Sequence, residues 1–254
     1  MIPANVQLGL GLIGIGKPWG HVPKPVPEER DAVRLLEFAF ELGIRYFDTA
    51  PSYGDGLSER RLGFFLKSLT SVQRNEVTVA TKFGEHWDAR TNEPYADHGY
   101  DALKRSLDAS LARLGGIDTL QLHKTTPQAL ASGDVAKAWD YATTTGIHRF
   151  GPSASDLESA RLALENPHYS VLQIPCNAAN PKFAPVLDAA GEQGIWVAVN
   201  RPFAMGAMVH EGTGKVPAFR FILRHRFTGV ILTGTTSPAH LRENWQAFRE
   251  ATAG

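Results

Sequence analysis

Short apolar segments rich in Val, Ile, Leu and Phe alternate along the chain with longer segments in which apolar residues recur every three or four positions. The first pattern predicts buried strands, and the second predicts amphipathic helices. Strands are expected at 7–13, 44–48, 77–82, 119–123, 148–152, 170–174, 195–199 and 230–232. Helices are expected at 28–42, 101–114, 128–144, 155–164, 183–192, 218–226 and 238–251.

This alternation implies a parallel sheet, because each helix carries the chain back to the start of the next strand. An open doubly wound sheet and a closed barrel both fit such a pattern. The eight expected strands, the length of 254 residues and the absence of a clear G-x-G-x-x-G after the first strand favour the barrel. The prediction is an α/β fold with a single domain over residues 1–254, a (β/α)8 TIM barrel.

Two polar, turn-rich segments, 84–98 and 205–216, follow predicted strands. In a barrel, the loops that follow strands lie at the carboxyl end, where active sites are found. Long loops at that end usually line the site. Both segments are therefore expected as loops near a functional pocket.

The amino-acid composition limits the kinds of partner and the cellular compartment that are expected. Lys and Arg together number 26, as do Asp and Glu, and this balance argues against a nucleic-acid partner or an anionic membrane. No apolar run approaches the roughly 18 residues of a membrane span, and the opening residues do not resemble a signal peptide. The single cysteine, Cys176, forms no intramolecular disulfide, so a reducing, cytoplasmic setting is expected. His86, His98 and His210 lack metal-ligand spacing, so no metal site is expected.

Three successive predicted strands each end in a polar residue that could belong to a functional site. Asp48 closes one strand, Lys82 the next and His123 the one after, while Tyr53 lies in the loop that follows Asp48. Each residue alone has an ordinary structural explanation as a turn former, a solvated strand end or a packed side chain. Three neighbouring strands that end in this way are better explained by a site at the barrel mouth. Burying Asp48 and Lys82 separately would be costly, so the two should pair.

These four side chains suit the reduction of a carbonyl. A carbonyl that accepts hydride develops negative charge on oxygen and needs a proton. A tyrosine has a pKa of about 10, and a nearby ammonium favours its phenolate form and lowers that pKa. Asp48 would keep Lys82 charged and in place. His123 would donate or accept a hydrogen bond at the reacting oxygen and orient the substrate.

Several motifs carry a family resemblance. The segment 47–54 (FDTAPSYG), followed by Ser58-Glu59 and Leu62-Gly63, is similar to the active-site signature of the aldo-keto reductase family. The segments 81–84 (TKFG) and 122–123 (LH) resemble the family's lysine and histidine strands. The resemblance implies a reductase that converts an aldehyde or ketone to an alcohol, or the reverse, with Tyr53 as general acid. Its implied catalytic residues are Asp48, Tyr53, Lys82 and His123.

The same resemblance implies a nicotinamide cofactor bound without a Rossmann domain. Ser153 and Gln173 would hold the carboxamide, Arg201 the pyrophosphate, and Glu243 and Asn244 the adenine. The residues expected to bind the cofactor are Gly11, Leu12, Ser153, Gln173, Asn200, Arg201, Phe203, Gly234, Thr235, His240, Glu243 and Asn244.

Some of these positions depart from the family pattern. Leu12 replaces a common Thr, Ala154 a common Asn, and Asn200 a residue that is often aromatic and stacks on the nicotinamide. Gly234 and His240 stand where relatives that prefer NADPH often carry basic residues. The expected cofactor is NADP, and NAD stays open.

The function expected from the sequence is that of an NAD(P)H-dependent oxidoreductase with a small-molecule carbonyl or alcohol as substrate. One alternative is a cofactor-binding regulatory or sensor protein on the same fold with little turnover. Another is a (β/α)8 enzyme of a different reaction type, such as a lyase or isomerase. The substrate, the direction of reaction and the oligomeric state are left open by the sequence.

Overall fold

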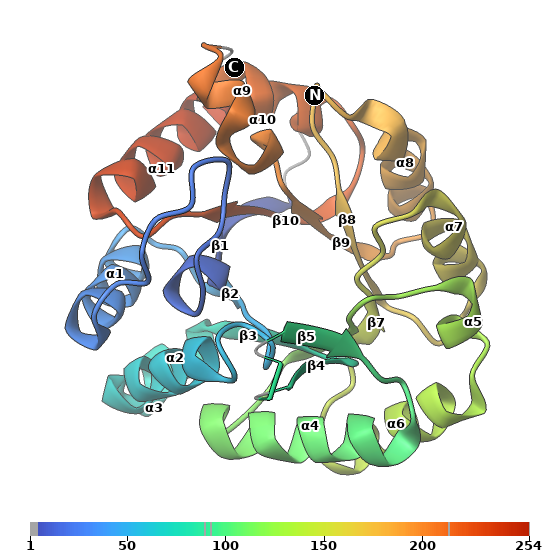
Figure 1. Ribbon diagram of the computed structural model, residues 1–254. Coiled ribbons are helices and arrows are strands. Elements are labelled where there is room, and N and C mark those ends of the chain that lie inside the picture. Colours follow the sequence, from blue (N-terminus) through green and yellow to red (C-terminus); the bar gives the residue numbers. More distant parts are fainter. Residues whose placement is uncertain (1–4, 89, 92, 213, 254) are drawn as a thin grey trace.

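Eight parallel strands form a barrel inside a ring of helices (Figure 1). The computed structural model describes residues 5–88, 90–91, 93–212 and 214–253. Neighbouring strands follow the order β7-β6-β3-β2-β1-β10-β9-β8. The ends of this order meet where the Ser170 amide donates to the Phe150 carbonyl and the Ala154 amide donates to the Gln173 carbonyl. The expected (β/α)8 barrel is confirmed.

All eight expected strands are present, with no end shifted by more than two residues. They are β1 (Val6–Gly11), β2 (Tyr46–Asp48), β3 (Thr78–Phe83), β6 (Thr119–Leu122), β7 (Phe150–Pro152), β8 (Val171–Pro175), β9 (Trp196–Asn200) and β10 (Thr228–Gly234). Successive side chains on a strand point to opposite faces. One face packs against the helices in the main core. The other fills the barrel lumen with a small cluster that includes Tyr46, Ala80, Ala198 and Val230.

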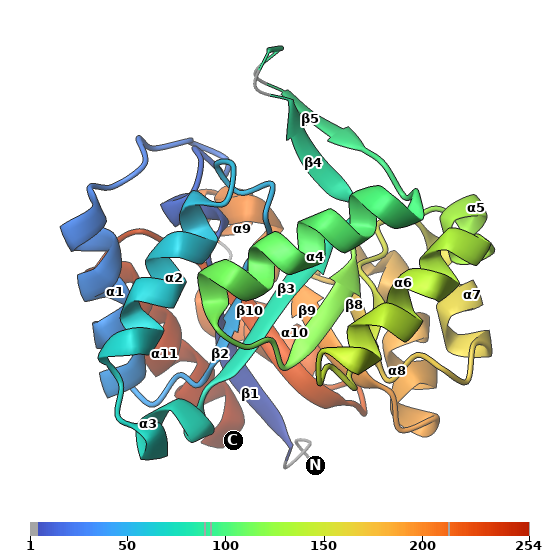
Figure 2. The same cartoon turned by 90° about the horizontal axis from the view of Figure 1, so that it is seen from below.

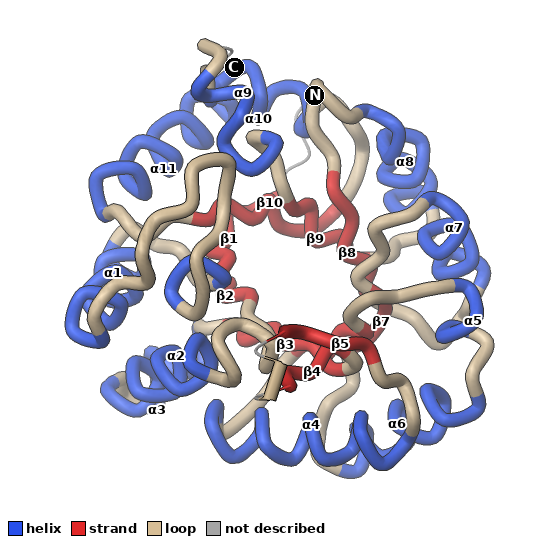
Figure 3. The backbone as a smooth tube through the Cα atoms, in the orientation of Figure 1, coloured by secondary structure: helices blue, strands red, loops and turns tan. Residues whose placement is uncertain are grey.

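The main helices lie outside the strands (Figure 3) and bury one apolar face each against them. They are α1 (Glu29–Glu41), α4 (Tyr100–Leu114), α6 (Gly133–Thr144), α7 (Leu157–Glu165), α8 (Ala184–Glu192), α10 (Lys215–Leu223) and α11 (Pro238–Ala253). Gly43 and Gly194 follow α1 and α8 in the left-handed region, as their positions predict. Within the described residues, no helix combines the length and apolar character needed to cross a lipid bilayer.

The helix expected over 128–144 is two helices. The first, α5 (Pro127–Leu130), is capped by the Thr126 hydroxyl, which accepts from the Ala129 amide. The second, α6, is capped by the Ser132 hydroxyl, which accepts from the Asp134 amide. Apolar periodicity continues across the break, so the pattern alone did not reveal it. The helix α10 is not split but shifted: it starts and ends three residues earlier than the expected range 218–226.

The sequence pattern missed several short elements and one long helix. The long helix is α2 (Leu57–Ser68), which begins after the left-handed Gly56 and buries the polar residues Glu59 and Arg61. Buried polar side chains obscure the apolar periodicity that would have predicted it. The other missed elements are α3 (Ser71–Glu76), α9 (Ala207–His210) and the short 3-10 turns η1 (Ile13–Ile15), η2 (Pro181–Phe183) and η3 (Ala204–Gly206).

The segment expected as a loop over 84–98 contains an antiparallel hairpin. Its strands are β4 (Glu85–Asp88) and β5 (Glu93–Ala96), and it projects from the barrel at the carboxyl ends of the strands (Figure 2). The rings of His86 and Tyr95 pack 5.4 Å apart across the two strands. The hairpin is polar and mostly open to solvent, which explains why its composition resembles that of a loop.

Candidate active site

A cavity of about 620 Å³ opens at the carboxyl ends of the barrel strands. Its size suits a cofactor or small-molecule site. Asp48, Tyr53 and His123 line it, and Lys82 lies just beneath, with 1% of its surface exposed. All twelve residues expected to bind the cofactor also line it. The catalytic and cofactor residues predicted from distant parts of the sequence therefore share one cavity.

Asp48 and Lys82 form a buried ion pair at the ends of two neighbouring strands, β2 and β3. The Lys82 ammonium donates to Asp48 Oδ1 at 2.7 Å and to the Thr49 carbonyl at 2.8 Å. Burial alone would lower the pKa of Lys82, but Asp48 and Tyr53 together raise it above its ordinary value. The pairing expected from the sequence is present, and the amine stays charged at neutral pH.

The second carboxylate oxygen of Asp48 is held from across the barrel. The Gln173 side-chain amide donates to Asp48 Oδ2 at 2.9 Å, and the Ser153 hydroxyl donates to Gln173 Oε1 at 2.7 Å. Gln173 is 2% exposed, so the amide groups that the family resemblance directs to a cofactor are engaged within the protein. Ser153 and Gln173 thus position Asp48, and their contact with a cofactor stays a prediction.

Tyr53 is held over Lys82 by the turn that follows β2. The Lys82 Nζ lies 5.2 Å from the centre of the Tyr53 ring, and the His123 ring lies 6.0 Å away, nearly perpendicular. Gly16, next to η1, touches this turn so closely that an added Cβ would lie 2.2 Å from the Tyr53 carbonyl oxygen. A residue larger than glycine at position 16 would therefore displace the turn that carries Tyr53.

The pKa of Tyr53 differs from the sequence-based expectation. Burial raises the pKa, the charge of Lys82 lowers it and Asp48 raises it, and the net result lies above the ordinary value. Lys82 therefore acts in the expected direction but does not overcome burial. The phenol is protonated at neutral pH and ready to donate.

Two further residues of the family-like motif, Ser58 and Glu59, connect α2 to the ends of β1 and β3. Glu59 on α2 is fully buried and accepts hydrogen bonds from the Thr81 hydroxyl at 2.6 Å and from Arg113 at 2.8 Å. Thr81 directly precedes Lys82. The Ser58 hydroxyl donates to the Leu12 carbonyl at 3.0 Å, which ties α2 to the end of β1. These contacts fix the position of the Lys82 strand.

Glu85 is a site residue that the sequence reasoning missed. Gly84, with φ of +101°, turns the chain at the end of β3 and places Glu85 in the cavity wall, 4% exposed. The Ser52 hydroxyl donates to Glu85 Oε2 at 2.5 Å, and the Lys124 ammonium lies 3.1 Å from Oε1. In a polar segment, a single Glu looks like a solvated residue. The only available signal was its position directly after the lysine strand.

The cofactor end of the cavity contains polar atoms without partners. Asn200 Oδ1 and Thr233 Oγ1 are buried and have no hydrogen-bond partner among the residues that the structure describes. Arg201 follows in a left-handed conformation, φ +54°, and its carbonyl accepts from the buried Asn177, another residue the sequence reasoning missed. Buried polar atoms are usually paired, so a molecule bound in the cavity would find hydrogen-bond partners in these two atoms.

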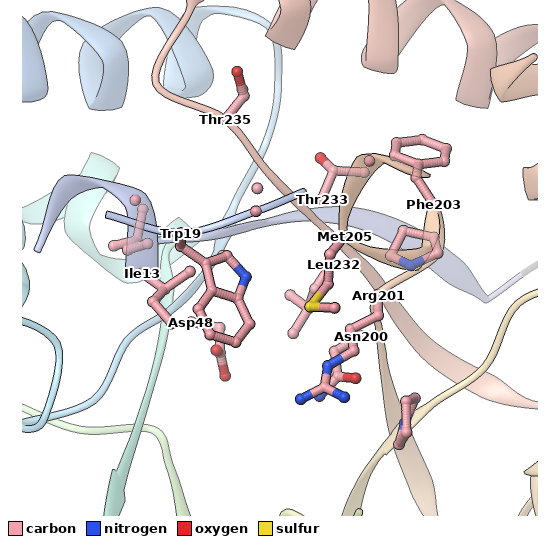
Figure 4. A pocket seen from close by; sticks show the side chains of 18 of the residues that line it. Ile13, Trp19, Asp48, Asn200, Arg201, Phe203, Met205, Leu232, Thr233 and Thr235 are labelled. Carbon is pink, nitrogen blue, oxygen red and sulfur yellow. The ribbon is translucent and has the colours of Figure 1, made fainter. Parts of the chain in front are cut away.

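Two loops meet above the cavity. The His21 amide donates to the Met205 carbonyl at 2.8 Å, and the rings of His21 and His210 lie 5.6 Å apart. Trp19 and Met205 extend toward the cavity from opposite sides (Figure 4). The segment expected as a loop over 205–216 therefore does line the site, although part of it is the short helix α9.

At the far end of the cavity, the loop after β10 leads into α11. The Thr235 hydroxyl accepts from the Ser237 amide at 3.0 Å, which shapes the turn before the helix. The Lys215 ammonium pairs with the Glu243 carboxylate at 2.7 Å. Lys215, which the sequence reasoning did not single out, places a positive charge beside Glu243.

Other reactive side chains show no comparable arrangement. Among the described residues, no three His, Cys, Asp or Glu side chains are grouped to hold a metal ion. Burial raises the pKa of Cys176 to about 11, so its thiol is inert at neutral pH.

Comparisons with known proteins agree with this site. A sequence model described as "Aldo/keto reductase family" matches residues 7–217. L-galactose dehydrogenase of Arabidopsis thaliana is 40% identical over 122 residues, which cover 47% of this chain and 36% of that protein. Against several curated relatives, the matched segment covers 25% to 36% of the relative's length.

Solved structures match nearly the whole chain. A crystal structure of an aldo-keto reductase from Pseudomonas aeruginosa has a TM-score of 0.81 and 25% identity, and covers 96% of this chain and 90% of that one. An aldo-keto reductase from Klebsiella pneumoniae, solved with NADPH, has a TM-score of 0.74 and 20% identity, with coverage of 98% and 90%. The second likeness concerns the fold alone.

Proposed function

We propose that this chain, which belongs to the aldo/keto reductase family, is an NAD(P)-dependent oxidoreductase that interconverts an aldehyde or ketone and an alcohol. The observation that carries the proposal is the buried Asp48–Lys82 pair beneath Tyr53, at one end of a cavity that continues to α11. A phenol above an ammonium is suited to proton transfer at a reacting oxygen. Beyond this pair the cavity is lined by residues from Gly11 to Asn244, and an extended cofactor would lie along them.

In the direction of reduction, Tyr53 donates its proton to the carbonyl oxygen. A nicotinamide cofactor, when bound, supplies the hydride. Lys82 stabilises the phenolate that remains on Tyr53, since the ammonium is buried next to the ring. Asp48 holds that ammonium in place through the 2.7 Å contact. In oxidation, the same phenolate takes the proton from the alcohol.

The residues at the other end fit a dinucleotide. Asn200 and Thr233 offer unpaired polar atoms, and the Arg201 guanidinium can pair with a pyrophosphate. The loop before α11 offers amide groups to a phosphate. Lys215 supplies a positive charge that the usual positions at Gly234 and His240 lack. We propose NADP as the cofactor because of this charge, with NAD as the alternative.

A binding titration followed by an activity assay tests the proposal. NADPH and NADH are titrated while nucleotide fluorescence is followed, and the protein is then assayed with a panel of aldehydes and ketones. Binding of NADPH in the micromolar range with turnover of at least one carbonyl is expected. Binding without any turnover would favour the regulatory alternative. No binding of either nucleotide would contradict the proposal.

A further inference from the structure

The imidazole of His123 has a carboxylate on its buried side. His123 Nδ1 has almost no exposed surface, and it lies 3.1 Å from Glu85 Oε2. The distance suits a charge-assisted hydrogen bond, although the ring is turned from ideal alignment. Among the described residues, Nδ1 has no partner that meets full hydrogen-bond geometry, and Glu85 Oε2 is the acceptor that lies within ion-pair distance of it. The side chain is 15% exposed and lines the cavity, so the ring edge that carries Nε2 faces the substrate space.

The Glu85 carboxylate is itself fixed and charged. Oε2 accepts from the Ser52 hydroxyl, and Oε1 lies next to the Lys124 ammonium. Burial alone would raise the pKa of Glu85, but its contacts with His123, Ser52 and Lys124 lower it below the ordinary value. A carboxylate in this state only accepts hydrogen bonds. The group that faces Nδ1 is thus an acceptor whose orientation is set by two donors.

We propose that Glu85 is a positioning residue that holds His123 in the tautomer protonated at Nδ1, so that Nε2 presents a lone pair to the substrate. This inference rests on the proposed function for its effect on substrates, but not for the tautomer. An unprotonated Nε2 cannot donate to a carbonyl oxygen. It accepts a hydrogen bond instead, and the donor that fits is a hydroxyl on the carbon beside the reacting one.

The charge state of His123 agrees with this arrangement. Burial, followed by the positive charge of Lys82, lowers its pKa to about 3, while Glu85 acts in the opposite direction. The imidazole is therefore neutral near pH 7 and carries one ring proton. Because Nδ1 faces a carboxylate, that proton lies on Nδ1. The proton delivered to the reacting oxygen still comes from Tyr53.

The substrate class that follows is an α-hydroxy carbonyl or its vicinal diol. Tyr53 serves the reacting oxygen as donor, and His123 serves the neighbouring hydroxyl as acceptor. A simple aldehyde leaves the Nε2 lone pair without a partner, and an unmet hydrogen bond in a buried site reduces binding. Discrimination between α-hydroxy carbonyls and simple aldehydes is thus set partly by Glu85, through the tautomer of His123.

Nuclear magnetic resonance reads the tautomer directly, in the protein as it is and without turnover. Two-bond proton–nitrogen spectra of the ¹⁵N-labelled protein near pH 7 distinguish protonated from unprotonated ring nitrogens, and the His123 signals are identified by their loss in His123→Asn. Protonation at Nδ1 alone is expected in the unaltered protein. A proton on Nε2, alone or together with one on Nδ1, would overturn the proposal.

Glu85→Gln supplies the complementary test. With the glutamine amide oxygen beside Lys124, the NH2 group takes the place of Oε2 and faces Ser52 and His123 Nδ1. The NH2 group then donates to Nδ1, and the ring proton moves to Nε2. Glu93→Gln on the exposed strand β5 of the same hairpin is the matched control and should leave the His123 signals unchanged. A Glu85→Gln variant that folds and keeps the Nδ1 proton would contradict the positioning role. If that variant does not fold, the spectrum of the unaltered protein still decides.

Kinetics test the consequence for substrates. For the unaltered protein, kcat/KM for 2-hydroxypropanal should exceed that for propanal by about tenfold, the value of one well-made hydrogen bond. This ratio should fall toward one in Glu85→Gln and stay unchanged in Glu93→Gln. An equal ratio in the unaltered protein would overturn the substrate class. Absence of turnover with every carbonyl would instead contradict the proposed function, while the tautomer result would stand on its own.

Discussion

The two ends of the cavity are built differently. At the Tyr53 end, the charged groups beneath and beside the ring are engaged within the protein: Lys82 with Asp48, and Glu85 with Ser52 and Lys124. At the other end, Asn200 and Thr233 carry buried polar atoms without partners among the described residues. Positive φ at non-glycine residues does not distinguish the two ends, because Asp55 and Lys124 near Tyr53 have it as well as Arg201, Ala204 and Met205.

This difference indicates which end is complete in the free protein. The polar network at the Tyr53 end holds its groups in fixed positions before any ligand arrives, which is what electrostatic stabilisation of a reacting oxygen requires. The Asn200 end has polar groups that a bound molecule would satisfy. Removing a charged group at the first end should therefore cost stability and catalysis, whereas substitutions at the second end should change ligand affinity without a loss of stability.

The largest effect is expected from Lys82→Met. Removing the ammonium leaves the Asp48 carboxylate buried without its partner, so the free energy of unfolding should fall by about 3–5 kcal/mol. Loss of the charge beside Tyr53 should also lower kcat by roughly 10²–10⁴-fold. Urea denaturation and steady-state kinetics measure the two effects.

The double variant Asp48→Asn with Lys82→Met separates these contributions. With the carboxylate gone, much of the lost stability should return, because no unpaired charge is buried. Activity should stay low. Recovery of activity in the double variant would show that Lys82 acts only through the fold.

Tyr53→Phe should affect catalysis without affecting the fold. The hydroxyl is the proposed proton donor, so kcat should fall by about 10²–10⁴-fold. The ring keeps its contacts with the turn, and the unfolding free energy should change by less than about 1 kcal/mol. Nucleotide affinity, measured by fluorescence, should be nearly unchanged. A variant that retained the full rate would rule out Tyr53 as the acid.

Thr233→Val tests the other end of the cavity. Valine has nearly the same shape as threonine and lacks the unpaired hydroxyl, so the free protein should gain about 1 kcal/mol in stability. The nucleotide should bind about fivefold more weakly if the hydroxyl contacts it. A loss of stability in the free protein would contradict the comparison between the two ends. Thr228→Val, on the exposed start of β10, is the matched control.

The smallest effect is expected from Lys215→Met, which removes a partly exposed charge. The preference for NADPH over NADH should fall by up to about fivefold, because exposed ion pairs contribute little. His240→Arg should raise the same preference. Lys67→Met, on the exposed side of α2, controls for a general change in charge. An unchanged ratio in both His240→Arg and Lys215→Met would contradict the role proposed for these two positions in the preference for NADPH.

Much of the fold could be predicted from the sequence because its signals are local. Each barrel strand is a short apolar run, and each main helix buries one apolar face, so strand and helix periodicities are readable without tertiary contacts. The same local logic placed Asp48, Lys82 and His123 at strand ends. It did not predict α2, whose buried Glu59 and Arg61 find their partners on other elements.

The sequence by itself therefore predicted the barrel, the order of its strands in the chain and the grouping of Asp48, Lys82 and His123 near Tyr53. The tertiary structure decided how they are supported. Gln173 turned out to hold Asp48, and Glu85 lies next to His123, because the barrel brings residues from distant strands within hydrogen-bond distance. Burial also outweighed Lys82 in setting the pKa of Tyr53. Hydrogen-bond partners and the burial of ionisable groups arise only when the chain folds, so they cannot be read directly from the order of residues.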